Sequence, residues 1–268
     1  LFAPGRIGPA STRTRTWIPA MVPWRSNDDG EVTDGVLDWY GRFAEGRPGV
    51  LVVEATGIRD IPSGPLLRIG SDDYIPGLAK LAETVHKRSS GQTRLLIQLI
   101  DFVGIRRRPD PAKYFERFLR ITDSHREKIA AQWSDADLAN ANITPDADLR
   151  NALFTRYTDQ PSDVHSILST REIEDLEYGH RERITDTHYQ HIAELPQVLP
   201  DLFAKAAKRA ELAGFHGAEL HYAHAYTMAS FLSATNTRKD GYGSTLEGRL
   251  RLPLEVFAAT KKSVSTGF

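Results

Sequence analysis

Three residues that can exchange or share protons, His221, His224 and Tyr226, lie within six positions of one another. An imidazole can donate a hydrogen bond to an oxygen on which charge develops, and a phenol with an ordinary pKa of about 10 can act as a proton donor at neutral pH. They directly follow residues 215–220, a short segment that we expect to form a buried strand. Gly214 precedes that segment, where a helix commonly ends on a glycine in the left-handed conformation. The sequence therefore predicts a helix, a tight turn, a strand and then a polar site.

Three further segments have the composition of buried strands, and helical patterns separate them. They lie at residues 15–22, 50–55 and 95–100, so that with 215–221 we expect four strand-plus-helix units. Short apolar runs of β-forming residues are typical of parallel strands covered on both faces. In parallel α/β proteins the chemistry collects where the carboxyl ends of the strands lead into loops. Residues that follow each strand are therefore candidates for the same site.

A longer string of residues around the polar site resembles a family signature. The pattern H-x-A-H-x-Y at 221–226 is followed by FLS at 231–233, N-T-R-x-D-x-Y-G at 236–243 and E-x-R-x-R at 247–251. This order is similar to the Old Yellow Enzyme family of NADH:flavin oxidoreductases, which usually has glycine where Ala225 stands. The resemblance implies an α/β fold of the (β/α)8 TIM barrel family, of which this chain covers about the first four βα units. We expect one incomplete barrel domain over residues 1–268, with a helical insertion at about 105–199.

The resemblance also implies FMN as cofactor and NADH or NADPH as reductant. Pro19, Ala20, Met21 and Val22 match a family phrase whose backbone lies against the flavin ring. Ala55 matches a residue that packs beside the flavin, and Gln98 one that lies against its pyrimidine end. Trp24 would line the substrate pocket by stacking.

The chain departs from the family at two of these places. Val22 replaces a residue whose hydroxyl or thiol hydrogen-bonds near the flavin O4, so either that contact is lost or Val22 is simply a buried strand end. Asp101 stands where the family usually has histidine, which leaves the family's substrate contacts from this loop unassigned. Glu54 could be a catalytic carboxylate, although a structural role is favoured. The run Arg106–Arg107–Arg108 could meet a cofactor phosphate, although a solvated charged run is favoured.

The activity implied by the resemblance is that of an FMN-dependent ene-reductase, acting on an enone, enoyl or nitro compound. His221 and His224 would bind the substrate's carbonyl or nitro oxygen, and Tyr226 would protonate the α-carbon. One alternative is a barrel relic or interaction module that holds no flavin. Another is a different barrel enzyme, such as a metal-dependent lyase, in which the two histidines form a metal pair; no third ligand lies near them in the sequence. The iron–sulfur dienoyl-CoA reductase branch of the family also stays open.

The composition of the chain limits which other classes of protein it could belong to. The 268 residues carry 34 basic and 35 acidic side chains, a net charge of −1 that gives no reason to expect nucleic-acid or membrane-surface binding. The absence of cysteine excludes disulfides and thiolate metal sites within these residues. No apolar run approaches the roughly 18 residues of a membrane span, so a cytoplasmic protein with a small-molecule substrate, which could form a homo-oligomer, is expected. Because a closed barrel needs eight strands, this chain is expected to be either a fragment of a longer protein or a half-barrel, and the fragment is favoured because a half-barrel would expose sheet edges and an apolar face.

Overall fold

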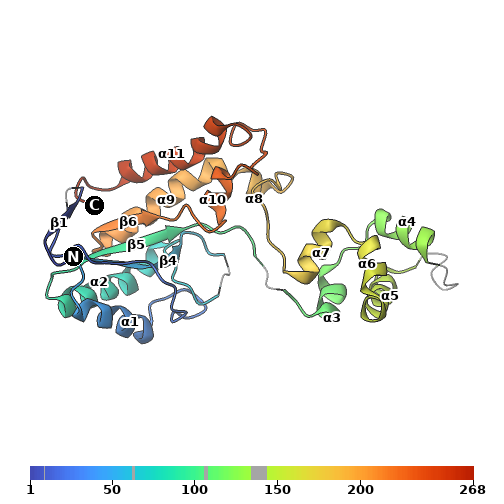
Figure 1. Cartoon of the computed structure of the whole chain (residues 1–268), viewed down its shortest axis with the longest axis horizontal. Helices are drawn as coiled ribbons and strands as arrows, with labels where there is room; N and C mark the ends of the chain where they lie inside the picture. The colour runs from blue at the N-terminus through green and yellow to red at the C-terminus, as the bar shows by residue number, and fades with distance from the viewer. Residues whose placement is uncertain (9, 62–63, 106–107, 134–143) are drawn as a thin grey trace. The chain divides into compact units, whose positions relative to one another are not determined.

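The computed structural model describes residues 1–8, 10–61, 64–105, 108–133 and 144–268 of the chain (Figure 1). These residues form two compact units, one made of Leu1–Val103 with Glu182–Phe268 and one made of Gly104–Arg181. The first unit holds every strand, and the second is helical. Arg106 and Arg107 of the arginine run lie outside the described residues.

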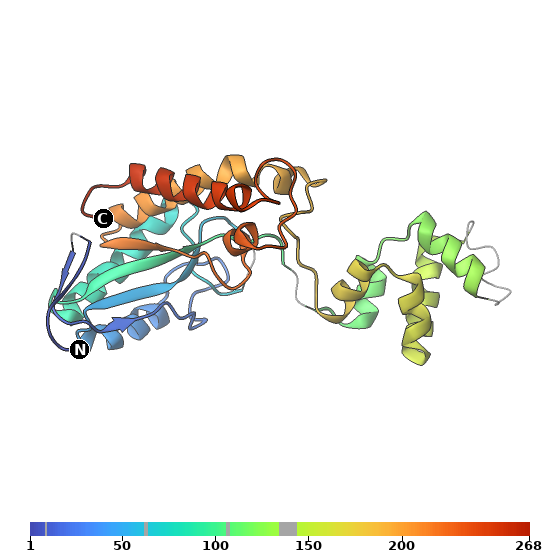
Figure 2. The same ribbon diagram turned by 45° about the horizontal axis from the view of Figure 1, so that its top comes forward.

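Four parallel strands of the first unit lie side by side in the order in which they occur along the chain (Figure 2). They are β3 (Trp17–Ile18), β4 (Val50–Gly57), β5 (Arg94–Ile100) and β6 (Gly217–Leu220). Each strand falls at a segment where the sequence predicts one, and β3 is short because Pro19 cannot donate to a ladder. Sequential parallel strands joined through helices are the arrangement of successive βα units of a barrel. The predicted four βα units are confirmed.

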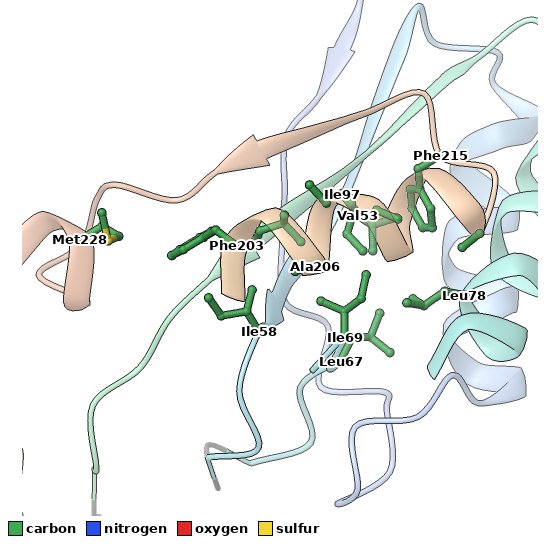
Figure 3. Close-up of a cluster of buried hydrophobic side chains, with 14 of the residues drawn as sticks. Val53, Ile58, Leu67, Ile69, Leu78, Ile97, Phe203, Ala206, Phe215 and Met228 are labelled. Atoms are coloured by element: carbon green, nitrogen blue, oxygen red, sulfur yellow. The ribbon is translucent and has the colours of Figure 1, made fainter. Parts of the chain in front are cut away.

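Helices cover one face of this sheet. They are α1 (Asp34–Glu45), α2 (Ile75–Ser89), α9 (Leu195–Leu212) and α11 (Leu246–Ser263). On β5 the residues Leu95, Ile97 and Leu99 belong to the core against the helices, whereas Leu96 and Gln98 alternate with them on the other face. Figure 3 shows Phe203 and Ala206 of α9 in the same core. Burying a large apolar side chain such as leucine or phenylalanine contributes about 1.5–3 kcal/mol, so this face is the main source of stability in the first unit.

Local signals in the sequence set the ends of two of these helices. The hydroxyl of Thr33 accepts a hydrogen bond from the backbone N–H of Val36 at 3.3 Å and caps the start of α1. Beyond α9 the chain turns through Gly214 at φ +89°, and the N–H of Phe215 donates to the carbonyl of Ala210 at 3.1 Å. The predicted glycine turn is confirmed, and it delivers the chain directly into β6.

A small antiparallel hairpin lies at the amino ends of the strands. It joins β1 (Gly5–Ile7) to β2 (Ala10–Thr12), and the carbonyl of Ser11 accepts a hydrogen bond from Arg94 Nε at 3.0 Å. Since Arg94 is the first residue of β5, the hairpin covers the end of the sheet opposite to the predicted site. Two cavities of about 470 and 340 Å³ open at this same end, each lined in part by Thr14 and Thr16.

The second unit has a hydrophobic core of its own, which includes Phe115, Ile129 and Leu153. Its helices are α3 (Pro111–Lys113), a π-helical turn (Tyr114–Phe118), α4 (Asp123–Gln132), α5 (Asp146–Asp159), α6 (Pro161–Ile167) and α7 (Thr170–Glu177). The helical segment expected at about 105–199 contributes to both units, because α8 (Gln190–Ala193) and the start of α9 bury their apolar side chains in the first core. No helix among the described residues is long and apolar enough to cross a membrane.

Candidate active site

The three polar residues singled out in the sequence gather just beyond β6. The backbone N–H of His221 donates to the carbonyl of Leu99 at 3.0 Å, so the sheet ladder continues one residue past the strand. The ring centroids of His221 and His224 lie 5.4 Å apart, and those of His221 and Tyr226 also lie 5.4 Å apart. Tyr226 is the residue that precedes α10 (Thr227–Leu232). The strand end and the helix start therefore hold the rings of His224 and Tyr226 each close to that of His221.

A left-handed turn makes this grouping possible. His224 and Ala225 have φ values of 54° and 55°, and the chain reverses there to bring Tyr226 back toward His221. Only glycine adopts this conformation without a steric cost, so the family's glycine at position 225 has a clear physical reason. Ala225 keeps the turn and carries the strain, as residues at functional sites often do.

His221 lies in a buried environment. Its side chain is buried, and burial lowers its pKa; the neighbouring His224 lowers it further, while Glu219 acts in the opposite direction. Its Nδ1 atom is buried with no hydrogen-bond partner among the described residues. An unpaired buried polar atom costs about 1–3 kcal/mol. A bound molecule with a polar atom at this position would remove that cost.

An apolar cluster joins the strand ends beside these residues. Ala55 and Phe102 are buried in it, and Val22 and Tyr226 pack against it, with the rings of Phe102 and Tyr226 in edge-to-face contact at 5.1 Å. The structure thus brings Val22 and Ala55, two of the predicted cofactor contacts, to the same place as Tyr226. The side chain of Val22 packs against this apolar cluster.

The other predicted residues after β3 are more exposed. Pro19, Ala20 and Met21 follow the strand directly, and Met21 is 41% exposed. Trp24 is 55% exposed, with φ at 56°, so the described residues leave much of its ring open. These residues occupy the expected edge of the sheet without packing into the group around Tyr226.

Gln98 has a partner that the sequence did not single out. It lies opposite Glu219 in the register of β5 and β6, and its Nε2 donates to Glu219 Oε1 at 2.5 Å. Ala218 and Leu220 pack toward the helices, so Glu219 and His221 share the opposite face with Gln98. The two-residue spacing between Glu219 and His221 was the signal that could have identified Glu219.

Asp101, which stands in place of the family's histidine, is held in an ion pair. Its buried carboxylate accepts two hydrogen bonds from Arg59, from Nε at 2.6 Å and from Nη2 at 2.9 Å. Burial raises the pKa of Asp101, and the adjacent guanidinium opposes that shift. The hydroxyl of Thr227 donates to the backbone carbonyl of Asp101 at 3.1 Å. The carboxylate introduced by this substitution therefore ties the ends of β4 and β5 together, and the backbone carbonyl of the same residue contacts the start of α10.

Glu54 points toward α1, in agreement with a structural role. Its Oε2 accepts a hydrogen bond from the Tyr40 hydroxyl at 3.1 Å, and its backbone N–H donates to the same hydroxyl at 2.8 Å. Its Oε1 accepts from the Leu67 N–H at 3.4 Å. Burial raises the pKa of Glu54 to about 7.

The N-T-R-x-D string that follows α10 holds its own loop in place. Arg238 is buried and donates to the carbonyls of Ile184, Ile192 and Ala193 at 2.6–3.1 Å, and it also pairs with Asp240. Its guanidinium therefore anchors the loop and is fully used in doing so.

The side chains near the strand ends offer hydrogen-bonding groups and an apolar surface of the kind that a flavin ring needs. An amide has two N–H donors and a carbonyl acceptor, and the bond from Gln98 to Glu219 uses one donor. The unpartnered Nδ1 of His221 and the apolar surface at Ala55 and Val22 add a polar contact and a packing surface. The part of the chain that the structure describes has no group of three His, Asp or Glu side chains that could hold a metal ion.

Known proteins are similar to this chain in sequence. Residues 137–268 match the sequence profile of the NADH:flavin oxidoreductase / NADH oxidase family. An NADH oxidase of Thermoanaerobacter brockii is 30% identical over 100% of this chain and 33% of its own length. An NADPH dehydrogenase of Bacillus cytotoxicus is 28% identical over 98% of this chain and 58% of its own length. The chain therefore spans between a third and about three fifths of these relatives.

Solved structures agree on the fold. The crystal structure of Old Yellow Enzyme from Pichia sp. AKU4542 superposes with a TM-score of 0.62 and 24% sequence identity, over 98% of this chain and 56% of that one. A match over about half of a barrel fits the four βα units of this chain. The fold is thus part of a TIM barrel, and residues 137–268 are similar in sequence to the NADH:flavin oxidoreductase / NADH oxidase family.

Proposed function

We propose that the protein containing this chain is an FMN-dependent oxidoreductase of the ene-reductase type, which uses NADH or NADPH to reduce an activated C=C bond. The observation that carries the proposal is the group of His221, His224 and Tyr226, with the buried, unpartnered Nδ1 of His221 among them. Because the chain spans only part of its relatives, this is the activity of a complete barrel that includes these residues.

FMN is the cofactor that the family implies, and it would supply the hydride chemistry between nicotinamide and alkene. Gln98 would hold the pyrimidine end of the ring by its amide. Val22 and Ala55 would pack beside the ring, and the backbone of Pro19, Ala20 and Met21 would follow its edge.

The chain's own residues would bind the substrate and supply a proton. His221 and His224 would donate hydrogen bonds to the oxygen of an enone, enoyl or nitro group, and so stabilise the charge that develops there. Fixed donors of this kind typically contribute a few kcal/mol each to the transition state. Tyr226, packed against Phe102, would deliver the proton to the α-carbon of the alkene.

The test uses the protein encoded by the complete gene. Its visible spectrum is recorded with FMN, then after NADH or NADPH, and then after 2-cyclohexen-1-one. We expect a yellow protein that bleaches with the nicotinamide and regains its colour with the enone. Tyr226→Phe should bleach at the unchanged rate but recover its colour at least about 100-fold more slowly, as expected for loss of a general acid.

The matched control is Tyr178→Phe, which alters an exposed tyrosine of the helical unit and should leave both rates unchanged. A colourless protein that takes up no FMN would contradict the proposal and favour the barrel relic. A cytoplasmic location and assembly into a homo-oligomer remain predictions from the sequence.

A further inference from the structure

Glu219 occupies a position that the proposed mechanism does not use. It projects from β6 on the face of the sheet away from the helices, directly opposite Gln98 in register and two residues before His221. Its Oε1 lies 2.5 Å from Gln98 Nε2. One carboxylate thus contacts the residue expected at the flavin and sits beside the residue expected at the substrate.

The chemistry of the pair determines how the Gln98 amide is oriented. An ionised carboxylate has acceptors only, so the NH₂ group of Gln98 must face Glu219. The carbonyl oxygen and the second N–H then remain for another partner. That remaining edge, an acceptor beside a donor, complements a ring edge that presents an N–H beside a C=O, as the pyrimidine ring of a flavin does. With an amide in place of the carboxylate, both orientations of Gln98 would be allowed.

The same carboxylate acts electrostatically on its strand neighbour. Glu219 raises the pKa of His221 against the stronger effect of burial and the further lowering by His224. Because Glu219 and His221 lie on one face of the sheet, a change of charge at position 219 affects both Gln98, which is expected at the flavin, and His221, which is expected at the substrate.

We propose, resting on the function proposed above, that Glu219 is a positioning residue that fixes the amide of Gln98 toward a bound flavin. It acts through Gln98 and does not touch the reacting atoms. Its negative charge also disfavours the added negative charge of the reduced flavin. The carboxylate therefore orients the binding edge and lowers the flavin midpoint potential.

The experiment is a double-mutant cycle in the full-length protein, with FMN binding measured by fluorescence quenching and the midpoint potential by spectroelectrochemistry. Glu219→Gln is expected to weaken FMN binding by about two- to tenfold, since the amide loses a charge-assisted bond and a single orientation. The midpoint potential is expected to rise. In the Gln98→Leu background the same substitution should have no further effect on FMN binding.

Glu83→Gln is the matched control, because Glu83 is an exposed carboxylate on α2, where it pairs with Lys87. The proposal is overturned if Glu219→Gln matches this control in both FMN binding and potential, or if the binding losses at positions 98 and 219 simply add. If Glu219→Gln does not fold, Glu219→Ala replaces it because it also removes the carboxylate, and wild-type FMN affinity in that variant would equally overturn the proposal. If the wild-type protein binds no FMN, the proposed function itself is rejected. If the wild-type protein is active and the Glu219 variants keep its FMN affinity and midpoint potential, only the role of Glu219 is rejected.

Discussion

At the scale of single residues, alternation along β6 decides which side chains can do chemistry. Ala218 and Leu220 face the helices and pack, whereas Glu219 and His221 face the other way and keep polar atoms available. Glu54 shows the opposite outcome at a strand end, because its carboxylate turns toward α1 and is satisfied there by Tyr40 and Leu67. Two carboxylates of similar sequence context thus have different roles.

Glu54 should make the stability of the fold depend on pH. Burial raises its pKa to about 7, above the roughly 4.3 of an exposed glutamate. Between these values the folded protein holds a proton that the unfolded chain has released, so stability falls as the pH rises through this window. We expect this group to lower the free energy of unfolding by about 3 kcal/mol between pH 5 and pH 8. Glu54→Gln should remove that loss, as measured by urea unfolding at both pH values.

The control for Glu54 is the exposed Glu83, whose pKa is lowered by Lys87. Glu83→Gln should leave the difference between pH 5 and pH 8 as it is in the wild type. An equal pH dependence in Glu54→Gln and the wild type would show that Glu54 is not protonated in the folded protein at pH 5.

Ala225 should tolerate glycine better than its neighbour does. Its φ of 55° is unfavourable for alanine, so Ala225→Gly is expected to raise the free energy of unfolding by about 0.5–1 kcal/mol. Ala223, which is outside the left-handed region, should lose stability on the same substitution, because glycine adds freedom to the unfolded chain. Thermal unfolding of the two variants separates these effects, and a stability loss in both would contradict the strain at Ala225.

At the scale of elements, Asp101 connects three of them. Arg59 follows β4, Asp101 follows β5, and Thr227 opens α10 with its hydroxyl on the Asp101 carbonyl. The side chain of Asp101 has no exposed surface, whereas that of Arg59 is 21% exposed. The pair therefore joins the two strand ends, and the backbone of Asp101 links them to the helix that follows Tyr226.

Breaking this pair from one side should be costly. Arg59→Met leaves an uncompensated buried carboxylate, and we expect the free energy of unfolding to fall by about 3–5 kcal/mol. The loss should be smaller at low pH, because an unpaired buried aspartate can then take up a proton. The double variant Arg59→Met/Asp101→Leu should recover much of the stability, since it removes the buried charge. A single variant as stable as wild type in urea unfolding at pH 8 would show that the pair contributes little.

At the scale of the whole molecule, the described part of the chain leaves apolar surface open. Exposed side chains recur along one stripe of α11, at Leu246, Leu250, Leu254 and Phe257. In the described sheet β3 and β6 each have one neighbour, so both edges offer unpaired backbone groups. Surface of this kind in a barrel is normally covered by adjoining βα units.

The chain of 268 residues on its own should therefore self-associate. We expect light scattering to show a mass that rises with protein concentration, and Leu250→Glu/Leu254→Glu to reduce that rise by placing charge on the stripe. Leu212→Glu, at an exposed leucine near the end of α9, is the control and should have a smaller effect. A concentration-independent monomer would contradict the expectation.

Local patterns in the sequence determined the elements and the polar site. Apolar runs predicted three of the four parallel strands, Gly214 predicted the turn into the fourth, and the spacing of His221, His224 and Tyr226 identified the group at its end. Each of these features depends on residues close together in the chain, where backbone preference and side-chain period act directly. The hairpin of β1 and β2 was missed, because its three-residue strands are too short to show a period.

Only the tertiary structure decided the pairings between distant residues. Gln98 meets Glu219 across 121 positions, and Arg59 meets Asp101 across 42. Such contacts depend on strand register and on which face each side chain takes, and neither is encoded by a local pattern. The raised pKa of Glu54 also depends on the tertiary structure, because it results from burial beneath α1. Sequence alone therefore identified candidate residues for the chemistry, and the fold determined which side chains they contact.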